Sequence, residues 1–287
     1  MSFTGLDVWL LAFVVGFLSL RLLRITTRDL LASALLEREN YRGVLLPTAA
    51  GILIVVAVLF VEAGRAVAGA IGIGNHEGLG VARSLVLFAV VGFGFLGFVD
   101  DVLGGTDTRG FRGHIAAVFH GRVTTGFVKL AGGGALAIVL VASPGFATGR
   151  RLVIDAVLIA LSANLANLLD RAPGRVIKTA FVGYVPLALV LGGGPVGVAL
   201  APVMGAAFGL LGEDLREHVM LGDTGANVLG GALGLAIVLG CGETVRLITL
   251  AVLAALNLAS EFVSFSAVIE RVAPLRAFDR LGRSAPS

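Results

Sequence analysis

Five aspartates lie at or near the ends of long apolar stretches of this chain. They are Asp100, Asp101, Asp170, Asp214 and Asp223. An ionised carboxylate at the mouth of a membrane-embedded cavity is costly to desolvate unless a partner compensates for its charge, so these residues are candidates for a functional site. The partner we expect is a divalent metal, because Mg²⁺ prefers oxygen ligands and keeps water and substrate phosphates in its shell.

Asp100 and Asp101 are adjacent at the end of one apolar stretch. Two carboxylates this close cannot both ionise cheaply without a cation or a shared proton. The pair therefore suits a metal site or a catalytic role. A solvated helix terminus is an equally good interpretation of the pair alone.

Asn164, Asn167 and Asp170 recur at every third position. On a helix of 3.6 residues per turn this spacing places them near one stripe. Two amides and a carboxylate on one stripe could line the wall of a substrate site. Asn164 and Asn167 could equally form hydrogen bonds between helices.

A basic turn follows this stripe. Arg171, Arg175 and Lys178 flank Pro173 and Gly174, a dipeptide that predicts a turn followed by a helix start. Such a turn suits the binding of an anion. A loop whose positive charge sets the membrane topology has the same composition.

The third acidic segment is Gly222-Asp223-Thr224-Gly225, in which glycines flank the aspartate. Glycine lets the backbone approach closely, and Thr224 offers a hydroxyl at a helix entrance where phosphate or metal oxygens could gather. The plain alternative is an N-cap made by Asp223 or Thr224.

The composition indicates which elements must position these residues. Hydrophobic residues make up 57% of the 287 residues, charged residues 14%, and 41 residues are glycine. With a mean hydropathy of +0.97, the chain is too apolar for a soluble domain and is predicted to be a polytopic, all-α membrane protein. We see no nucleic-acid signature, and the single Cys241 excludes internal disulfides and cysteine-based metal sites.

Apolar runs of about the length of a membrane span predict nine or ten transmembrane helices in a single integral membrane domain, residues 1–287. The nine candidates are Leu6–Leu23, Val44–Val61, Ser84–Val99, Phe127–Val141, Leu152–Leu169, Val176–Leu191, Pro195–Leu211, Ala226–Leu239 and Val245–Ile269. Because Lys and Arg concentrate in cytoplasmic loops, the N-terminus is expected outside and the C-terminus in the cytoplasm. All five aspartates then fall on the cytoplasmic face.

Together these segments resemble the polyprenyl-phosphate sugar-1-phosphate transferases, the membrane family of phospho-N-acetylmuramoyl-pentapeptide transferase and the polyprenyl-phosphate N-acetylhexosamine-1-phosphate transferases. In this family an Asp-Asp pair closes a span, an Asn-rich stretch ends in Asp, and a Met-Gly-Asp-x-Gly segment opens a later helix. The matching residues are Asp100-Asp101, Asn164 to Asp170, and 221–225, with 47–51 resembling an early Pro-Thr-x-Gly-Gly element.

The resemblance implies Mg²⁺-dependent transfer of a sugar-1-phosphate from a nucleotide-diphosphate sugar to a polyprenyl phosphate. The reaction would occur at the cytoplasmic face of the plasma membrane, in cell-wall and peptidoglycan synthesis, and a homodimer is compatible with it. By family correspondence Asp223 would hold Mg²⁺, Asp101 would support the metal or the phosphates, and Asp100 would orient or deprotonate the lipid phosphate. Substrate-binding residues are expected at Asn164, Asn167, Asp170, Lys129, Arg171 and Arg175.

The chain departs from the family pattern at two places. Where the family reads Asn-x-x-Asp-Gly-x-Asp-Gly, Arg171 replaces the first Gly and Pro173 replaces the second Asp, which is expected to contact the nucleotide base. The family's histidine-rich last cytoplasmic loop is also absent from 271–283. Arginines at 276, 280 and 283 could take over as diphosphate ligands, or could anchor the chain to anionic lipid.

Three classes of function therefore stay open. The first is an active transferase with an altered donor site. The second is a non-catalytic family member that binds polyprenyl phosphate or scaffolds envelope-synthesis enzymes. The third is a transporter, since carboxylates in membranes also mark ion pathways, although transporter sites are expected near the midplane of the membrane.

Overall fold

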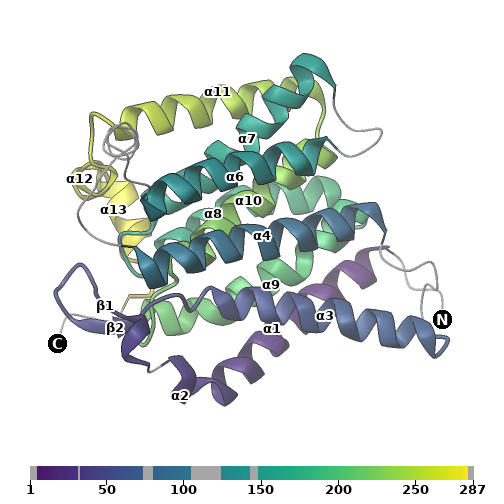
Figure 1. Cartoon of the computed structure of the whole chain (residues 1–287), viewed down its shortest axis with the longest axis horizontal. Coiled ribbons are helices and arrows are strands. Elements are labelled where there is room, and N and C mark those ends of the chain that lie inside the picture. The colour runs from purple at the N-terminus through teal and green to yellow at the C-terminus, as the bar shows by residue number, and fades with distance from the viewer. Residues whose placement is uncertain (1–4, 32, 74–79, 105–123, 143–147, 284–287) are drawn as a thin grey trace.

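The computed structural model describes residues 5–31, 33–73, 80–104, 124–142 and 148–283 (Figure 1). Most of these residues are helical, which confirms the predicted all-α membrane fold. The helices are α1 (Gly5–Thr26), α2 (Arg28–Leu31), α3 (Ile52–Ala70), α4 (Val81–Leu103), α6 (Thr125–Val141), α7 (Gly149–Leu169), α8 (Arg175–Leu191), α9 (Pro195–Leu215), α10 (Gly222–Gly240), α11 (Glu243–Ser260), α12 (Phe265–Arg271) and α13 (Ala273–Arg280), with a 3₁₀ turn at Ala34–Leu36.

Eight of the nine predicted spans overlap one helix each, and the last, Val245–Ile269, overlaps both α11 and α12. Within the described ranges, seven helices are long and apolar enough to cross a membrane, namely α1, α3, α4, α7, α9, α10 and α11. The two remaining predicted spans correspond to α6 and α8, which have 17 residues each. The chain is therefore a multi-pass membrane protein.

Two predicted boundaries are wrong. The last span was expected to run from Val245 to Ile269, but α11 ends at Ser260 and a separate α12 begins after Ser264. The Ser264 side chain accepts a hydrogen bond from the Ala267 backbone N–H, so it caps a new helix start that interrupts the apolar run. The second span was expected from residue 44, but Pro47 disfavours helix at its predecessor, and 45–47 form a strand.

That strand belongs to a hairpin that the all-α expectation omitted. Strand β1 (Glu37–Glu39) pairs antiparallel with β2 (Leu45–Pro47), with Arg38 opposite Leu46. The Asn40 carboxamide oxygen accepts hydrogen bonds from the backbone N–H groups of residues 42 and 44, at 2.8 and 3.0 Å, and so closes the turn. The hairpin also contacts the end of α4, because the Arg38 guanidinium donates to the carbonyl oxygens of Asp101 and Val102, each at 3.1 Å.

Glycine contacts hold the spanning helices together, as the composition predicted. A Cβ atom added to Gly205 of α9 would lie 2.0 Å from the carbonyl oxygen of Phe13 in α1. One added to Gly230 of α10 would lie 2.4 Å from the carbonyl oxygen of Ser162 in α7. Helix α10 is the most enclosed span, so its N-terminal end is held rigidly among α4, α7 and α9.

The hairpin, α12 and α13 lie at the same end of the bundle, on the left in Figure 1, whereas the start of α1 lies at the other end. The ends of α4, α7 and α9 and the starts of α8 and α10 also meet there. This is the end at which the topology argument placed the acidic segments. Arg109, Arg112 and Arg122 belong to a loop that the topology argument places on the cytoplasmic face, and they lie outside the described residues.

Candidate functional site

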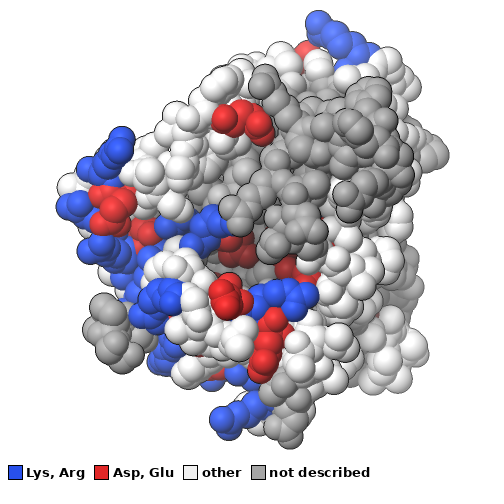
Figure 2. Space-filling model, turned by 60° about the vertical axis from the view of Figure 1, so that its left-hand side comes forward, with Lys and Arg blue, Asp and Glu red and all other residues white. Residues whose placement is uncertain are grey.

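A cavity of about 530 Å³ opens at this end of the bundle. This volume is within the range of sites for small molecules. Figure 2 shows acidic side chains inside a hollow on this face and basic side chains around it. The cavity is lined by Arg38, Glu39, Asn40, Tyr41, Leu46, Thr48, Asp100, Asp101, Gly104, Asp170, Arg171, Ala172, Pro173, Asp214, Glu217, Val219, Met220, Gly222 and Asp223.

Lys129 of α6 joins two of the predicted site residues. Its ammonium group lies 2.6 Å from Asp100 Oδ2 and also pairs with Asp223 Oδ2. The three residues come from α4, α6 and α10, and each keeps part of its side chain exposed: 15% for Asp100, 22% for Lys129 and 29% for Asp223. We call these three residues the acid–lysine cluster. One cation thus compensates two carboxylates at the cavity wall.

Asp101 has a different environment from its neighbour Asp100. Its Oδ1 accepts a hydrogen bond from the Asp223 N–H at 3.0 Å, and its Oδ2 accepts bonds from the Thr224 N–H at 2.9 Å and the Thr224 hydroxyl at 2.6 Å. These N–H groups belong to the first turn of α10, which has no intrahelical partners for them. Asp101 therefore caps α10 from the neighbouring helix.

Two glycines permit this arrangement. Gly222 has a φ of +74°, and a Cβ atom there would lie 2.6 Å from Asp101 Oδ2. A Cβ atom on Gly97 of α4 would lie 2.4 Å from the carbonyl oxygen of Asp223. The end of α4 and the start of α10 therefore touch backbone to backbone, and this contact sets the distance between the two acidic segments.

Asp170 lies on another wall of the cavity, just beyond the end of α7. Burial, together with the charges of Asp214, Asp223 and Asp101, raises the pKa of Asp170 well above its ordinary value. The neighbouring turn is held from α9, because Asp214 Oδ2 accepts a hydrogen bond from the Gly174 N–H at 2.9 Å. The negative charge on this wall is thus only partly compensated.

Of the predicted basic turn, Arg171 lines the cavity, whereas Arg175 does not. Arg175 is only 7% exposed, and its guanidinium pairs with Asp279 of α13, with Nε 2.7 Å from Oδ1. The expectation that Arg175 binds substrate is therefore corrected: it contacts the C-terminal helices, because α13 packs against the start of α8.

The two predicted asparagines also make contacts between helices. Asn164 donates to Asn257 of α11 at 2.6 Å, and Asn167 donates to Asn227 of α10. Neither lines the cavity. Of the two roles left open for them, the structure favours the hydrogen bonds between helices, and Asp170 alone of the stripe lines the cavity.

The hairpin supplies cavity residues that the sequence argument missed. Arg38 and Tyr41 line the cavity from this hairpin. Its turn is tied to the segment before α10, because Glu217 accepts a hydrogen bond from Asn40 at 2.7 Å and pairs with Arg42 at 2.6 Å. The Asn-x-x-Gly pattern at 40–43 is a turn signature that could have indicated a hairpin here.

Mg²⁺ fits the chemistry of the cavity, although the described residues hold no group of three His, Cys, Asp or Glu side chains placed to bind a metal. Mg²⁺ is usually bound by one or two carboxylates together with waters and substrate phosphates, so a complete protein cage is not needed. Seven carboxyl groups but only two guanidinium groups line the cavity. Asp223 is the most exposed carboxylate of the acid–lysine cluster, whereas the oxygens of Asp101 are occupied by the α10 cap.

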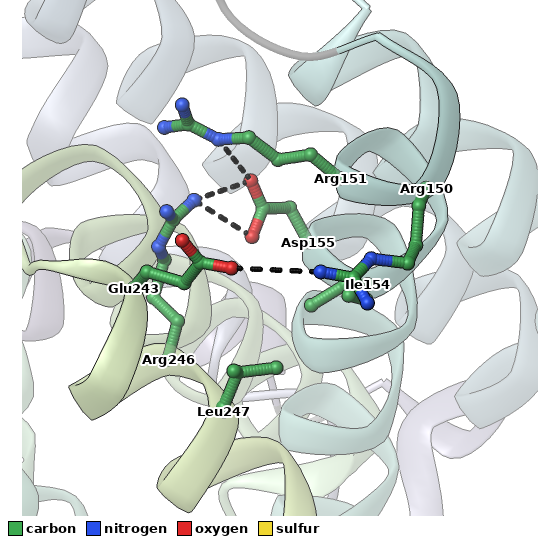
Figure 3. Close-up of a pocket in the computed structure, with 7 residues that line it drawn as sticks. All are labelled: Arg150, Arg151, Ile154, Asp155, Glu243, Arg246 and Leu247. Carbon is green, nitrogen blue, oxygen red and sulfur yellow. Dashed lines mark hydrogen bonds and ion pairs between the residues drawn. The ribbon is translucent and has the colours of Figure 1, made fainter.

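A second ionic cluster lies at the opposite end of the bundle, where α7 and α11 begin (Figure 3). Arg246 donates to both oxygens of the buried Asp155, at 2.7 and 3.0 Å, and Arg151 and the Arg150–Glu243 pair lie around them. The hollow there is about 30 Å³, roughly the share of one water molecule. It is too small for a phosphate-containing substrate, whereas the cavity of about 530 Å³ is large enough for one.

No protein-family model matches the chain. Among curated proteins it is similar to the phospho-N-acetylmuramoyl-pentapeptide-transferase of Geobacillus thermodenitrificans (strain NG80-2), with 32% identity over 180 residues, 56% of this chain and 53% of the relative. The enzyme of the same name from Shouchella clausii (strain KSM-K16) is 33% identical over 215 residues, 67% of this chain and 60% of the relative.

A third relative of that name, from Maricaulis maris (strain MCS10), is 26% identical over 245 residues, 71% of this chain and 66% of the relative. The chain spans about half the length of the first of these relatives. These matches confirm the family resemblance drawn from the motifs.

Proposed function

Because this chain is a homologue of the phospho-N-acetylmuramoyl-pentapeptide transferases, we propose that it transfers a sugar-1-phosphate from a nucleotide-diphosphate sugar to a polyprenyl phosphate. The end of the bundle that carries the cavity would face the cytoplasm, in the plasma membrane. The product would be a lipid-linked intermediate of cell-envelope synthesis. The name of the homologues specifies a phospho-N-acetylmuramoyl-pentapeptide as the transferred group. For this chain we propose only the class of donor, a nucleotide-diphosphate sugar.

The observation that carries the proposal is the acid–lysine cluster, whose two carboxylates, Asp100 and Asp223, line a cavity at one end of the spanning helices. Phosphoryl transfer needs little covalent chemistry from the protein and depends on positioning and on stabilising negative charge. A cavity at the membrane surface can admit a water-soluble donor from one side and a lipid phosphate from the other. The cluster lies where two such substrates would meet.

Each cluster residue has a distinct proposed role. Asp100 would accept a proton from, or orient, the lipid phosphate whose oxygen attacks the sugar-bearing phosphorus of the donor. The bond from that phosphorus to the bridging oxygen breaks, and a nucleoside monophosphate leaves. Lys129 would hold Asp100 ionised and contact the transferred phosphoryl group. Asp101 would position Asp223 and Thr224 by fixing the start of α10.

When Mg²⁺ is bound, it supplies electrostatic stabilisation of the negative charge on the diphosphate. Asp223 would be its protein ligand, and Asp170, across the cavity, would line the nucleotide side. Arg171 would contact the donor phosphates from the same wall. Arg38 already donates to the end of α4, so we assign it to holding that helix end.

The test is an assay of the full chain in lipid nanodiscs with polyprenyl phosphate, Mg²⁺ and a panel of nucleotide-diphosphate sugars. Released nucleoside monophosphate and the lipid product would be measured by mass spectrometry. We expect turnover with at least one donor and a loss of about 10²-fold or more in Asp223→Asn. A matched control is Asp155→Asn, which breaks a buried ion pair at the other end of the bundle and should retain turnover in the folded fraction.

The second candidate function is a non-catalytic protein that binds polyprenyl phosphate. Pro173 on the cavity wall favours it, because this residue stands where the family pattern has a second aspartate. In that case nanodiscs of the wild-type chain would retain polyprenyl phosphate but release no nucleoside monophosphate from any donor in the panel. That result would replace the transferase proposal.

A further inference from the structure

Asp279 of α13 is a buried carboxylate held by two arginines. Its side chain keeps 8% exposure, and Arg175 contacts it through Nε at 2.7 Å and through its second amino group at 3.0 Å. Arg283 contacts Asp279 Oδ2 at 2.6 Å. A third contact of Arg175 runs to the Ser266 hydroxyl of α12 at 2.9 Å. One arginine at the start of α8 therefore binds both C-terminal helices.

Lys178, one turn further along α8, binds the same segment through its backbone. Its ammonium group donates to the carbonyl oxygens of residues 278, 279 and 281, at 3.1, 2.6 and 3.1 Å. These carbonyls lie in the last turn of α13 and at its C-cap, Leu281, where a cation is favourable. Lys178 thus makes three contacts to the C-terminal end of α13.

The segment held in this way touches the cavity wall. Arg283 Nε donates to the carbonyl oxygen of Pro173 at 3.1 Å, and Pro173 lines the cavity together with Asp170, Arg171 and Ala172. On the other side of the turn, the Gly174 N–H is bound by Asp214. The 170–174 turn is therefore fixed between α9 and the C-terminal segment.

We propose that Arg175, Lys178, Asp279 and Arg283 form a C-terminal clasp that positions the 170–174 turn as the donor-binding wall of the cavity. The proposal rests on the proposed transferase function and assigns the clasp residues as positioning residues. They would set the affinity for the nucleotide-sugar donor, because Asp170 and Arg171 reach the cavity from this turn, whereas the acid–lysine cluster stands on other helices.

The electrostatics of the clasp agree with this role. Burial opposes the ionisation of Asp279, but the hydrogen bonds and charges of Arg175 and Arg283 outweigh it and hold the pKa of Asp279 below its ordinary value. The carboxylate is therefore charged near neutral pH. Removing its charge leaves Arg175 buried without a counter-ion, so the clasp should loosen at this point first.

The experiment compares Asp279→Asn with Asp155→Asn in the full chain in nanodiscs. Both variants break a buried Asp–Arg pair, but only the first is part of the clasp. The first readout is hydrogen exchange of the backbone amides of 170–174, which needs no catalytic activity. The second is the KM for the donor and for the lipid acceptor, measured separately.

We expect Asp279→Asn to speed amide exchange in 170–174 about 10-fold and to raise the donor KM by about 10-fold, with the acceptor KM within about 2-fold of wild type. Asp155→Asn should change neither quantity. Unchanged exchange in folded Asp279→Asn, or an equal rise of both KM values, would overturn the proposal. If Asp279→Asn does not fold, Arg283→Gln, which removes the contact to Pro173, must give the same pattern.

The two proposals fail separately in this experiment. A wild-type chain with no turnover would reject the transferase function, and the exchange arm would still decide whether the clasp holds the turn. Normal turnover with unchanged exchange and donor KM in both clasp variants would reject the clasp alone.

Discussion

The ammonium group of Lys129 pairs with the carboxylate of Asp223, although the two residues are 94 positions apart and lie on different helices. The same ammonium group binds Asp100. A lysine shared by two carboxylates has two consequences: it places one positive charge beside both acids, and it occupies a position that another cation could take in its absence.

Replacing Lys129 with Met should lower the free energy of unfolding by about 2 kcal/mol, less than for a fully buried pair because the three side chains are partly exposed. Turnover should fall by about 10²-fold or more. Millimolar Mg²⁺ should restore much of the lost thermal stability by bridging Asp100 and Asp223, whereas the wild-type chain should respond less. Melting temperatures with and without Mg²⁺ test this, with Lys129→Arg as the charge-retaining control. Equal responses to Mg²⁺ in wild type and Lys129→Met would contradict it.

Asp101 and Asp223 should differ in metal dependence. Asp101→Asn should lower the free energy of unfolding by about 1–2 kcal/mol, because the amide cannot accept all the hydrogen bonds of the α10 cap. It should keep the Mg²⁺-induced rise in melting temperature, since we propose that Asp101 positions α10 and that Asp223 holds the metal. Asp223→Asn should lose that rise. Thermal unfolding across a Mg²⁺ titration separates the two roles. If Asp101→Asn also loses the Mg²⁺-induced rise in melting temperature, Asp101 is a metal ligand and the prediction is wrong.

Asp170 should make stability depend on pH. Its pKa is raised in the folded state, so between about pH 4, the unfolded value, and the raised value the folded chain binds more protons than the unfolded chain. Stability must therefore fall as the pH rises through this window. Asp170→Asn lacks this term, so it should melt at a higher temperature than wild type at pH 7 and at a similar one near pH 4. Scanning fluorimetry in EDTA measures the melting temperatures of both proteins at both pH values. The prediction is refuted if the melting temperature of Asp170→Asn, relative to that of wild type, is lower at pH 7 than at pH 4.

A side chain larger than that of glycine at the contact between α4 and α10 should destabilise the protein. Gly97→Ala places a Cβ within 2.4 Å of the carbonyl oxygen of Asp223, and should cost about 1–3 kcal/mol of stability and most of the activity. Gly64→Ala is the matched control, because nothing lies within 4 Å of a Cβ at this helical position. That control should be neutral or slightly stabilising. Retained activity in folded Gly97→Ala would show that the helix spacing is not critical.

The sequence predicted much of this structure. Runs of apolar residues gave the spanning helices, because burial in lipid demands continuous apolar length. The acidic segments were placed at one end because loop charge is biased across a membrane. Asp100 and Asp223, identified by their positions after and before such runs, are indeed in one cluster with Lys129.

Other features depend on tertiary contacts that local patterns do not encode. Asp100 and Asp101 look equivalent in sequence, yet one meets Lys129 and the other caps α10, because a helix turns adjacent side chains about 100° apart. Arg175 carries the same charge as Arg171 but lies against α13. The carboxylate that decides this, Asp279, is 104 positions away.

The glycine contact between α4 and α10 also bears on how this protein could change its specificity. The acid–lysine cluster is set by backbone contacts between spanning helices, whereas the 170–174 turn is held by side chains, from Asp214 of α9 on one side and from Arg283 of the C-terminal segment on the other. Substitutions in the C-terminal segment can therefore reshape one wall while the reacting groups keep their spacing. Under the proposed function, recognition of the leaving nucleotide and the phosphoryl chemistry would then be separable traits, open to independent engineering.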